Sequence, residues 1–144
     1  MNEIEILLVE DNKGDVLLTL EVFRELMLTN KIKIVKDGEE AILYLNKEKE
    51  FETVQTPGLI FLDINLPKIN GKEVLHYINS QKHLMHIPVI ILTTSSSQLD
   101  KDECYKKNAT YYIIKPLDVN SLLQGIASLK NYTMSIMSPA KVVD

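Results

Sequence analysis

The chain has 144 residues, 45% of them hydrophobic and 25% charged, which fits one globular domain. A net charge of -4 and a single arginine, Arg24, argue against electrostatic binding to DNA or RNA. The lone cysteine, Cys104, excludes an intramolecular disulfide, and no apolar run nears the ~20 residues that cross a bilayer, so we expect a cytoplasmic protein with neither nucleic-acid nor membrane partners.

Five short apolar runs alternate along the chain with stretches of helical periodicity. The runs cover residues 4–9, 32–35, 59–62, 87–92 and 111–114. They are too short for helices and most are rich in Ile or Val, as buried strands are. The sequence therefore predicts five strands separated by helices.

The helical segments differ in how firmly they can be anchored. Apolar faces at three- and four-residue spacing begin at Val16, Ala41, Val74 and Val119. Residues 97–107 offer only Leu99, Cys104 and Tyr105, so we expect a weakly anchored helix there. Residues 46–57 are polar and charged, which predicts a solvated loop.

Apolar strands that alternate with amphipathic helices favour an α/β fold in which a parallel sheet is covered on both faces. Right-handed crossovers then give a five-stranded, doubly wound parallel sheet, and the flavodoxin-like strand order 2-1-3-4-5 is the preferred topology. In such a sheet the functional site lies beyond the carboxyl ends of the strands. The residues that follow each apolar run are therefore the candidates for function.

Charged and polar side chains follow four of the five runs. Glu10 and Asp11 follow the first run, Asp63 the third, Thr93 the fourth and Lys115 the last. If the predicted topology holds, these side chains meet at one edge of the sheet. The sequence therefore predicts a cleft that contains three carboxylates, a hydroxyl and an ammonium group.

The charge of this cluster indicates a metal site. Two carboxylates about 5 Å apart repel by roughly 3 kcal/mol at an effective dielectric constant of about 20, so three together need a cation or a raised pKa. The ligands are all oxygen, which suits Mg2+ and disfavours zinc. Beside Mg2+ and Lys115, the Asp63 carboxylate could attack phosphorus and form an aspartyl phosphate.

Each of these residues also has an ordinary structural explanation when it is taken alone. An aspartate after a strand is more often a turn former or a helix cap, and a lone lysine is usually solvated. Residues 1–15 carry the whole net charge of -4, and Asp15 within them is expected only to cap the first helix. It is the joint pattern at four strand ends that favours a site.

Four motifs carry these residues in order along the chain. They are Leu7-Leu8-Val9-Glu10-Asp11-Asn12, residues 62–71 with Asp63-Ile64-Asn65-Leu66-Pro67, Leu92-Thr93-Thr94-Ser95 and Ile114-Lys115-Pro116. Over nearly the whole chain, their order and spacing resemble the receiver domain of two-component response regulators. The spacings of 30 residues from Asp63 to Thr93 and 22 from Thr93 to Lys115 are also similar to the family's.

The resemblance implies that Asp63 is the phosphoacceptor and takes a phosphoryl group from a sensor histidine kinase or a phosphotransfer protein. It also implies a Mg2+ cofactor bound by Asp11, Asp63 and the backbone carbonyl of Asn65, with Glu10 assisting. Such a protein is a phosphoacceptor rather than an enzyme, although it could catalyse its own dephosphorylation.

The resemblance implies roles for four further residues. Lys115 would contact the phosphoryl group, and Thr93 would move toward it on activation. Tyr112 matches the family's switch aromatic and would turn inward when Thr93 moves. The peptide bond between Lys115 and Pro116 would be cis.

One subgroup is more similar than the rest, namely the stand-alone regulators paired with bacterial phytochromes. The similarity lies in the run Leu92-Thr93-Thr94-Ser95, the longer loop near residues 46–57 and the extended C-terminus. It implies a phytochrome-type kinase and a homodimer formed through the face of the fourth helix, fifth strand and fifth helix. We expect a receiver domain at residues 1–132, a tail at 133–144 and no output domain, so output would be a protein contact or a phosphate relay.

Three rival functions remain. A Mg2+-dependent phosphatase of the haloacid-dehalogenase type would need a second acid where Asn65 stands. A flavodoxin-like FMN carrier would need a Gly- or Thr-rich phosphate loop after the first strand, which the chain lacks. A phosphorylation-deficient scaffold would not need the intact acidic cluster.

Overall fold

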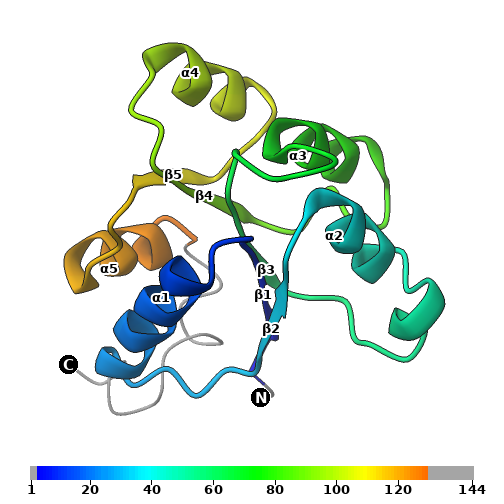
Figure 1. Cartoon of the computed structure of the whole chain (residues 1–144), viewed down its shortest axis with the longest axis horizontal. Helices are drawn as coiled ribbons and strands as arrows, with labels where there is room; N and C mark the ends of the chain where they lie inside the picture. Colours follow the sequence, from blue (N-terminus) through cyan, green and yellow to red (C-terminus); the bar gives the residue numbers. More distant parts are fainter. Residues whose placement is uncertain (1–2, 130–144) are drawn as a thin grey trace.

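The computed structural model describes residues 3–129, in which five parallel strands alternate with five α-helices (Figure 1). The strands are β1 (Ile6–Val9), β2 (Ile32–Val35), β3 (Leu59–Leu62), β4 (Val89–Thr93) and β5 (Tyr111–Ile114). The helices are α1 (Lys13–Glu25), α2 (Gly38–Leu45), α3 (Gly71–Ser80), α4 (Gln98–Lys106) and α5 (Val119–Ala127), with a short 3-10 helix η1 (Lys49–Phe51). The sheet order β2-β1-β3-β4-β5 confirms the predicted doubly wound α/β fold.

The sheet is covered on both faces. Helices α1 and α5 lie on one face, and α2, α3 and α4 lie on the other (Figure 1). Side chains alternate between the faces, so Leu8 and Phe61 pack with Phe23 of α1, whereas Leu7 and Leu62 pack on the opposite side. Because β1 and β3 are buried along their whole length, both read as continuous apolar runs.

Two strand boundaries differ from those predicted. β1 begins at Ile6 rather than at residue 4, and β4 spans Val89–Thr93 rather than residues 87–92. Ile87 lies outside β4 because its N–H donates to the carbonyl of Leu84 and closes the turn after α3. At the other end, Thr93 continues β4 because its carbonyl accepts from the N–H of Lys115, 2.7 Å away. This bond ties the ends of β4 and β5 together at the edge where the polar residues lie.

Each of the five helices begins after a side chain that accepts a hydrogen bond from a backbone N–H in the first helical turn. These capping residues are Asn12, Asp37, Asn70, Ser97 and Asp118. The expectation that Asp15 caps the first helix is therefore wrong, since Asn12 takes that role and accepts from the N–H of Asp15 at 2.9 Å. The carboxylate of Asp15 instead contacts another residue.

Helix α4 is weakly anchored by apolar contacts, as expected, because Cys104 is its only buried residue. Its attachment to α3 is ionic: the Lys72 ammonium lies 2.5 Å from the Asp100 carboxylate and 2.8 Å from that of Glu103. A hydrogen bond of 2.6 Å from the Ser95 hydroxyl to Asp100 joins the helix to the end of β4. Polar groups thus hold α4 where the other helices use apolar ones.

The prediction of a solvated loop at residues 46–57 is wrong in part. Within it, η1 buries Phe51, whose ring meets that of Tyr44 edge-on at a centroid distance of 5.1 Å. One aromatic residue anchors an otherwise charged segment. The expected tail at residues 133–144 lies outside the described residues. None of the helices within 3–129 is long and apolar enough to cross a membrane.

Candidate phosphoryl-acceptor site

Asp63 is held at the carboxyl end of β3 and is 5% exposed. Its Oδ1 accepts from the N–H of Asn65 at 3.1 Å, and its Oδ2 lies 2.9 Å from the ammonium nitrogen of Lys115. Gly71 packs against the backbone here, since a Cβ at that position would lie 2.0 Å from the carbonyl oxygen of Asp63. The glycine allows α3 to start directly beside Asp63, and its N–H donates to the carbonyl of Ile64 at 2.7 Å.

Three carboxylates meet beside Asp63, as the sequence predicts. Oxygen atoms of Glu10, Asp11 and Asp63 all lie within 4.8 Å of one another. Glu10 is 2% exposed, whereas Asp11 is exposed to solvent. A cavity of about 530 Å3 opens on this side and is lined by Asp11 and by Asn65, among others.

The donor set fits a divalent metal ion. It consists of oxygen atoms only, and three carboxylates face one ammonium group, which leaves an excess of negative charge. One carboxylate is exposed and borders the cavity, so an ion has access to the cluster. Zinc would require Cys or His ligands, and the cluster found among residues 3–129 contains neither.

Lys115 is the cation of the site, and its side chain is only 8% exposed. Its Nζ lies 2.5 Å from Glu10, 2.8 Å from Asp15 and 2.9 Å from Asp63. Burial alone would lower the pKa of Lys115, but the hydrogen bonds to these carboxylates outweigh it and raise the pKa above the ordinary lysine value. The ammonium group therefore stays charged at neutral pH.

Glu10 is the most perturbed carboxyl group of the site. Burial raises its pKa to about 7, and the neighbouring charge of Asp63 adds to the increase. The contact with Lys115 acts in the opposite direction and limits the shift. The pKa of Glu10 is thus raised mainly because its carboxyl group is buried, and the charge of Asp63 contributes less.

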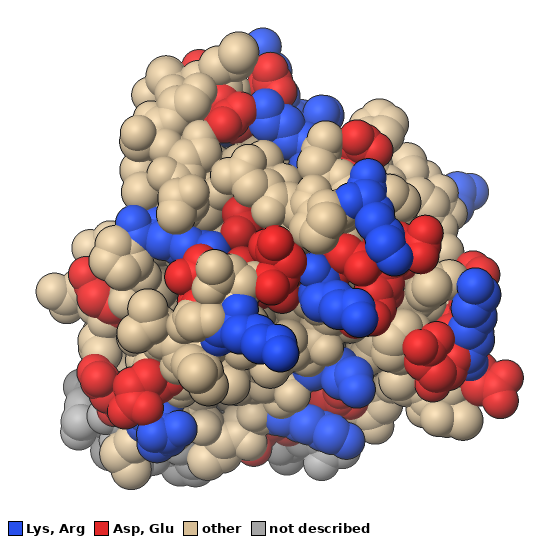
Figure 2. All heavy atoms as spheres, in the orientation of Figure 1, with Lys and Arg blue, Asp and Glu red and all other residues tan. Residues whose placement is uncertain are grey.

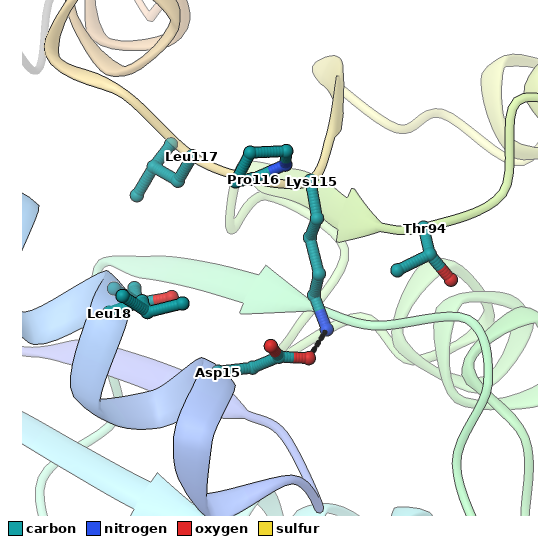
Figure 3. A pocket seen from close by; sticks show the side chains of 7 residues that line it. Asp15, Leu18, Thr94, Lys115, Pro116 and Leu117 are labelled. Atoms are coloured by element: carbon teal, nitrogen blue, oxygen red, sulfur yellow. Dashed lines mark hydrogen bonds and ion pairs between the residues drawn. The ribbon is translucent and has the colours of Figure 1, made fainter.

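Asp15 is the residue that sequence reasoning missed. It lies in the first turn of α1, and its carboxylate turns toward Lys115 (Figure 3). Together with Thr94 and Pro116, the pair lines a cavity of about 220 Å3 next to the site. The only sequence signal was the excess of acidic residues in positions 1–15, to which Asp15 contributes.

Thr93 and Tyr112 belong to β4 and β5, and both contact Ser95. Thr93 is fully buried at the end of β4, and its hydroxyl accepts from the N–H of Ser95 at 3.4 Å. Tyr112 is 7% exposed, and its hydroxyl donates to the carbonyl of Ser95 at 2.9 Å. The tyrosine is therefore turned inward in this structure, and its movement in response to Thr93 stays a prediction.

The remaining predicted residues lie around the same edge. The Lys115–Pro116 peptide bond is cis. Asn65 is exposed and follows Asp63 by two residues, so its backbone borders the acidic cluster. The structure thus brings together Glu10, Asp11, Asp63, Thr93 and Lys115 from four different strand ends. Such an arrangement can bind a divalent cation and present one carboxylate oxygen to an electrophile.

Comparison with known proteins shows that the chain is similar to regulatory proteins that include response regulators. The profile of the family described as response regulator receiver domain matches residues 6–127. The probable methanogenesis regulatory protein FilR2 of Methanothrix harundinacea is 38% identical over 127 residues, which are 88% of this chain and 81% of the relative. Response regulator Rcp1 of Synechocystis is 34% identical over 133 residues, or 92% and 90% of the two chains.

Solved structures of similar proteins include phytochrome-associated regulators. Bacteriophytochrome response regulator RtBRR has a TM-score of 0.81 and 39% identity, covering 88% of this chain and 78% of its own. The phosphorylated cyanobacterial phytochrome response regulator RcpA has a TM-score of 0.80 and 37% identity, covering 94% and 99%. The Mn2+-bound form of Rcp1 has a TM-score of 0.80 and 36% identity with the same coverage.

Proposed function

Because the chain belongs to the response regulator receiver domain family, and its homologues are stand-alone phytochrome-associated regulators, we propose that it accepts a phosphoryl group on Asp63 and signals through protein contacts. The observation that carries this proposal is the placement of Asp63. Its carboxylate is buried at the end of β3, with the Lys115 ammonium 2.9 Å away and two further carboxylates alongside. A nucleophile, a cation and a metal-binding set are then within one cleft.

Each residue of the site would have a separate role in phosphoryl transfer. Asp63 supplies the attacking oxygen, and its other oxygen stays fixed by the N–H of Asn65. Lys115 provides a positive charge for the phosphoryl oxygens. Glu10, Asp11, Asp63 and the backbone carbonyl of Asn65 would hold Mg2+, which supplies charge neutralisation for the transferred group.

We propose a sensor histidine kinase or a phosphotransfer protein as the phosphoryl donor. Several relatives are named as phytochrome response regulators, which favours a phytochrome-type kinase for this chain. Phosphotransfer from such a kinase would take place in the cytoplasm. Hydrolysis of the acyl phosphate would return the protein to its resting state.

Phosphorylation would act on α4 through Thr93 and Tyr112. It adds roughly -1.5 to -2 charges at pH 7 and new acceptor oxygens, which the Thr93 hydroxyl can bind. Ser95 connects that threonine to Tyr112 and to Asp100 of α4, so a shift of Thr93 would alter both contacts. Because Tyr112 is already buried, we propose that the switch changes its bond to Ser95 rather than its burial.

Output would occur through the face of α4, β5 and α5, as a homodimer. Four large apolar side chains are exposed on these elements: Leu99, Tyr105, Ile114 and Leu123. Acidic and basic side chains are interspersed over the face shown in Figure 2, so that face offers no broad basic surface for nucleic acid. We propose that residues 1–132 form the receiver domain and that its output is a protein contact.

The test is phosphorylation with acetyl phosphate, followed by intact mass spectrometry. With Mg2+ the wild-type chain should gain one phosphoryl group, and Asp63→Asn or excess EDTA should prevent this. Asp118→Asn removes a carboxylate that caps α5 outside the cluster, so it should label like the wild type. Undiminished labelling of Asp63→Asn would contradict the proposal, and rapid turnover of a phosphomonoester by the wild type would favour the phosphatase instead.

A further inference from the structure

We propose that Asp15 is a positioning residue for phosphoryl transfer, which holds the Lys115 ammonium group beside Asp63 from the first turn of α1. The proposal rests on the proposed function, in which Asp63 accepts the phosphoryl group. It goes further because Asp15 belongs to neither the predicted metal ligands nor the predicted switch residues. The experiment below separates the two claims.

Asp15 is one of the hydrogen-bond acceptors around the Lys115 ammonium group. An ammonium group has three N–H donors, and the structure places three carboxylates around it. Glu10 and Asp63 come from the ends of β1 and β3, whereas Asp15 comes from α1. Asp15 and Asp63 accept hydrogen bonds from the ammonium group, Glu10 forms an ion pair with it, and Asp15 is the only one of the three that a helix supplies.

Within the described residues, Asp15 is neither a metal-binding residue nor a helix cap. It does not belong to the group of Glu10, Asp11 and Asp63 that could hold a metal ion. It is not the helix cap, because Asn12 is. Its side chain is 32% exposed, and partly exposed ion pairs contribute little to stability. The specific contact of Asp15 is the one with Lys115.

The side chain of Lys115 is held at a cavity between α1 and the segment that follows β5. The cavity that Figure 3 shows is lined by Asp15 and Leu18 of α1 and by Lys115, Pro116 and Leu117 after β5. The Asp15–Lys115 bond of 2.8 Å crosses this cavity and links the two segments. Without Asp15, the two partners left to the ammonium group are both strand-end carboxylates, so it would be drawn over Asp63 and would mask the nucleophile.

The contact between Asp15 and Lys115 becomes important during phosphoryl transfer. With acetyl phosphate, a carboxylate oxygen of Asp63 forms the bond to phosphorus, and the bond from phosphorus to the acetate oxygen breaks. Acetate leaves with that electron pair, so charge is conserved. The Asp63 carboxyl oxygens then carry no charge of their own, and the attraction for Lys115 moves to the phosphoryl oxygens. Asp15 takes no part in the bond to phosphorus, so its contact would hold the ammonium group within reach of these oxygens throughout the transfer.

The experiment compares initial rates of phosphorylation by acetyl phosphate with Mg2+. Asp15→Ala should slow the reaction about tenfold, since small displacements of a catalytic group cost one to two orders of magnitude. Asp15→Asn keeps a hydrogen-bond acceptor in place and should be slowed less. Glu21→Ala is the matched control, because it removes a carboxylate from the same helix that pairs with Arg24 and not with Lys115, and it should leave the rate unchanged.

A double-mutant cycle tests whether Asp15 acts through Lys115. In a Lys115→Ala background, Asp15→Ala should have no further effect on the rate. Equal rates for Asp15→Ala and the wild type would overturn the inference, and so would an equal slowing in both backgrounds or an Asn variant as slow as the Ala variant. Failure of the wild type itself to become phosphorylated would instead overturn the proposed function.

Discussion

At the scale of single residues, the site is a balance of buried charges. A buried ion without partners costs several kcal/mol, so Lys115 is stable in its 8% exposed position only because carboxylates surround it. The balance is incomplete, because Lys115 contacts three carboxylates and Asp11 adds a fourth to the cleft. An excess of negative charge in a cleft favours a cation over an anion. The phosphoryl group would therefore enter only after a divalent ion has bound.

Tyr44 is a buried ionisable residue outside the site, and it gives a prediction about alkaline stability. Burial, followed by the nearby charge of Glu5, raises its pKa from 10.0 to about 12. A folded-state pKa above the unfolded one leaves stability intact below pH 10 and removes it as the pH rises toward 12. The loss from this residue should be about 1.4 kcal/mol by pH 11.

The measurement is urea unfolding of the wild type and Tyr44→Phe at pH 9 and pH 11. The variant should lose about 1.4 kcal/mol less than the wild type over this interval, because it has no hydroxyl to ionise. An identical pH dependence in the two proteins would contradict the assignment.

Single residues also show where sequence reasoning ends. Asp63, Glu10 and Lys115 were predictable because each directly follows an apolar strand, and parallel strands place their ends together. The role of Asp15 was not predictable, since a carboxylate in the first turn of a helix is equally suited to capping that helix. Whether it caps the helix or binds a cation depends on the residue that lies across the cavity. The inward orientation of Tyr112 depends on a backbone carbonyl, which no sequence pattern specifies.

At the scale of elements, α4 differs from its neighbours in what holds it. Only Cys104 is buried, and the helix is joined to α3 through Lys72 and to β4 through Ser95. Ionic and hydrogen-bonded contacts can change partners with a smaller loss of free energy than the separation of an apolar interface requires. We therefore expect α4, which Ser95 joins to the proposed switch residues, to shift more easily than helices with apolar anchors.

Removal of the Lys72 ammonium group should loosen α4. Lys72→Met loses both ion pairs, and partly exposed pairs are worth about 0.2–1 kcal/mol each, so amide hydrogen exchange in Gln98–Lys106 should become a few-fold faster. Lys82→Met removes an exposed lysine outside this network and serves as the control. Unchanged exchange in α4 of Lys72→Met would contradict the account.

The same contacts should respond to acid. Hydrogen bonds from Lys72, and to a smaller extent from Ser95, lower the pKa of Asp100. These bonds stabilise the folded protein fully at pH values above the ordinary pKa of a carboxyl group. Their contribution is lost as the pH falls through the lowered pKa of Asp100. After correction for intrinsic rates, protection of α4 in the wild type should decrease below about pH 4, and Lys72→Met should show a smaller decrease.

The elements themselves were largely predictable. β2, β3 and β5 have the predicted boundaries because each is a short apolar run that ends at a polar residue. The start of β4 was misplaced because Ile87 is apolar yet closes a turn, and η1 was missed because a single buried Phe51 stands among charged residues. In both cases a local hydrogen bond or one tertiary contact overrode the pattern.

At the scale of the whole molecule, the acidic cluster and the proposed dimer face are separate surfaces. The cluster lies at the carboxyl ends of the strands, and exposed apolar side chains occur on the face formed by α4, β5 and α5 as well as on α1. The two are connected through Thr93, Ser95 and Tyr112, which link the end of β4 to β5. A charge added at one surface could therefore change association at the other.

Sedimentation measures this association directly. The wild type should form dimers at micromolar concentration, and beryllofluoride as a phosphoryl mimic should favour them further. Ile114→Asp places a charge on the 47% exposed end of β5 and should weaken the dimer about tenfold or more. Leu17→Asp, an equivalent change on exposed α1, should dimerise like the wild type. A monomeric wild type at high micromolar concentration, with and without the mimic, would rule out this dimer.

Chemical mapping tests most directly whether Asp63 carries the phosphoryl group. The wild-type protein is treated with acetyl phosphate and Mg2+, reduced with borohydride and digested for peptide mass spectrometry, because borohydride converts an aspartyl phosphate to homoserine. The account predicts homoserine at position 63, dependent on Mg2+ and absent from Asp63→Asn. Homoserine at Asp11 or Asp15, or 5-hydroxynorvaline at Glu10, with none at position 63, would contradict this assignment, and so would the absence of any acyl phosphate.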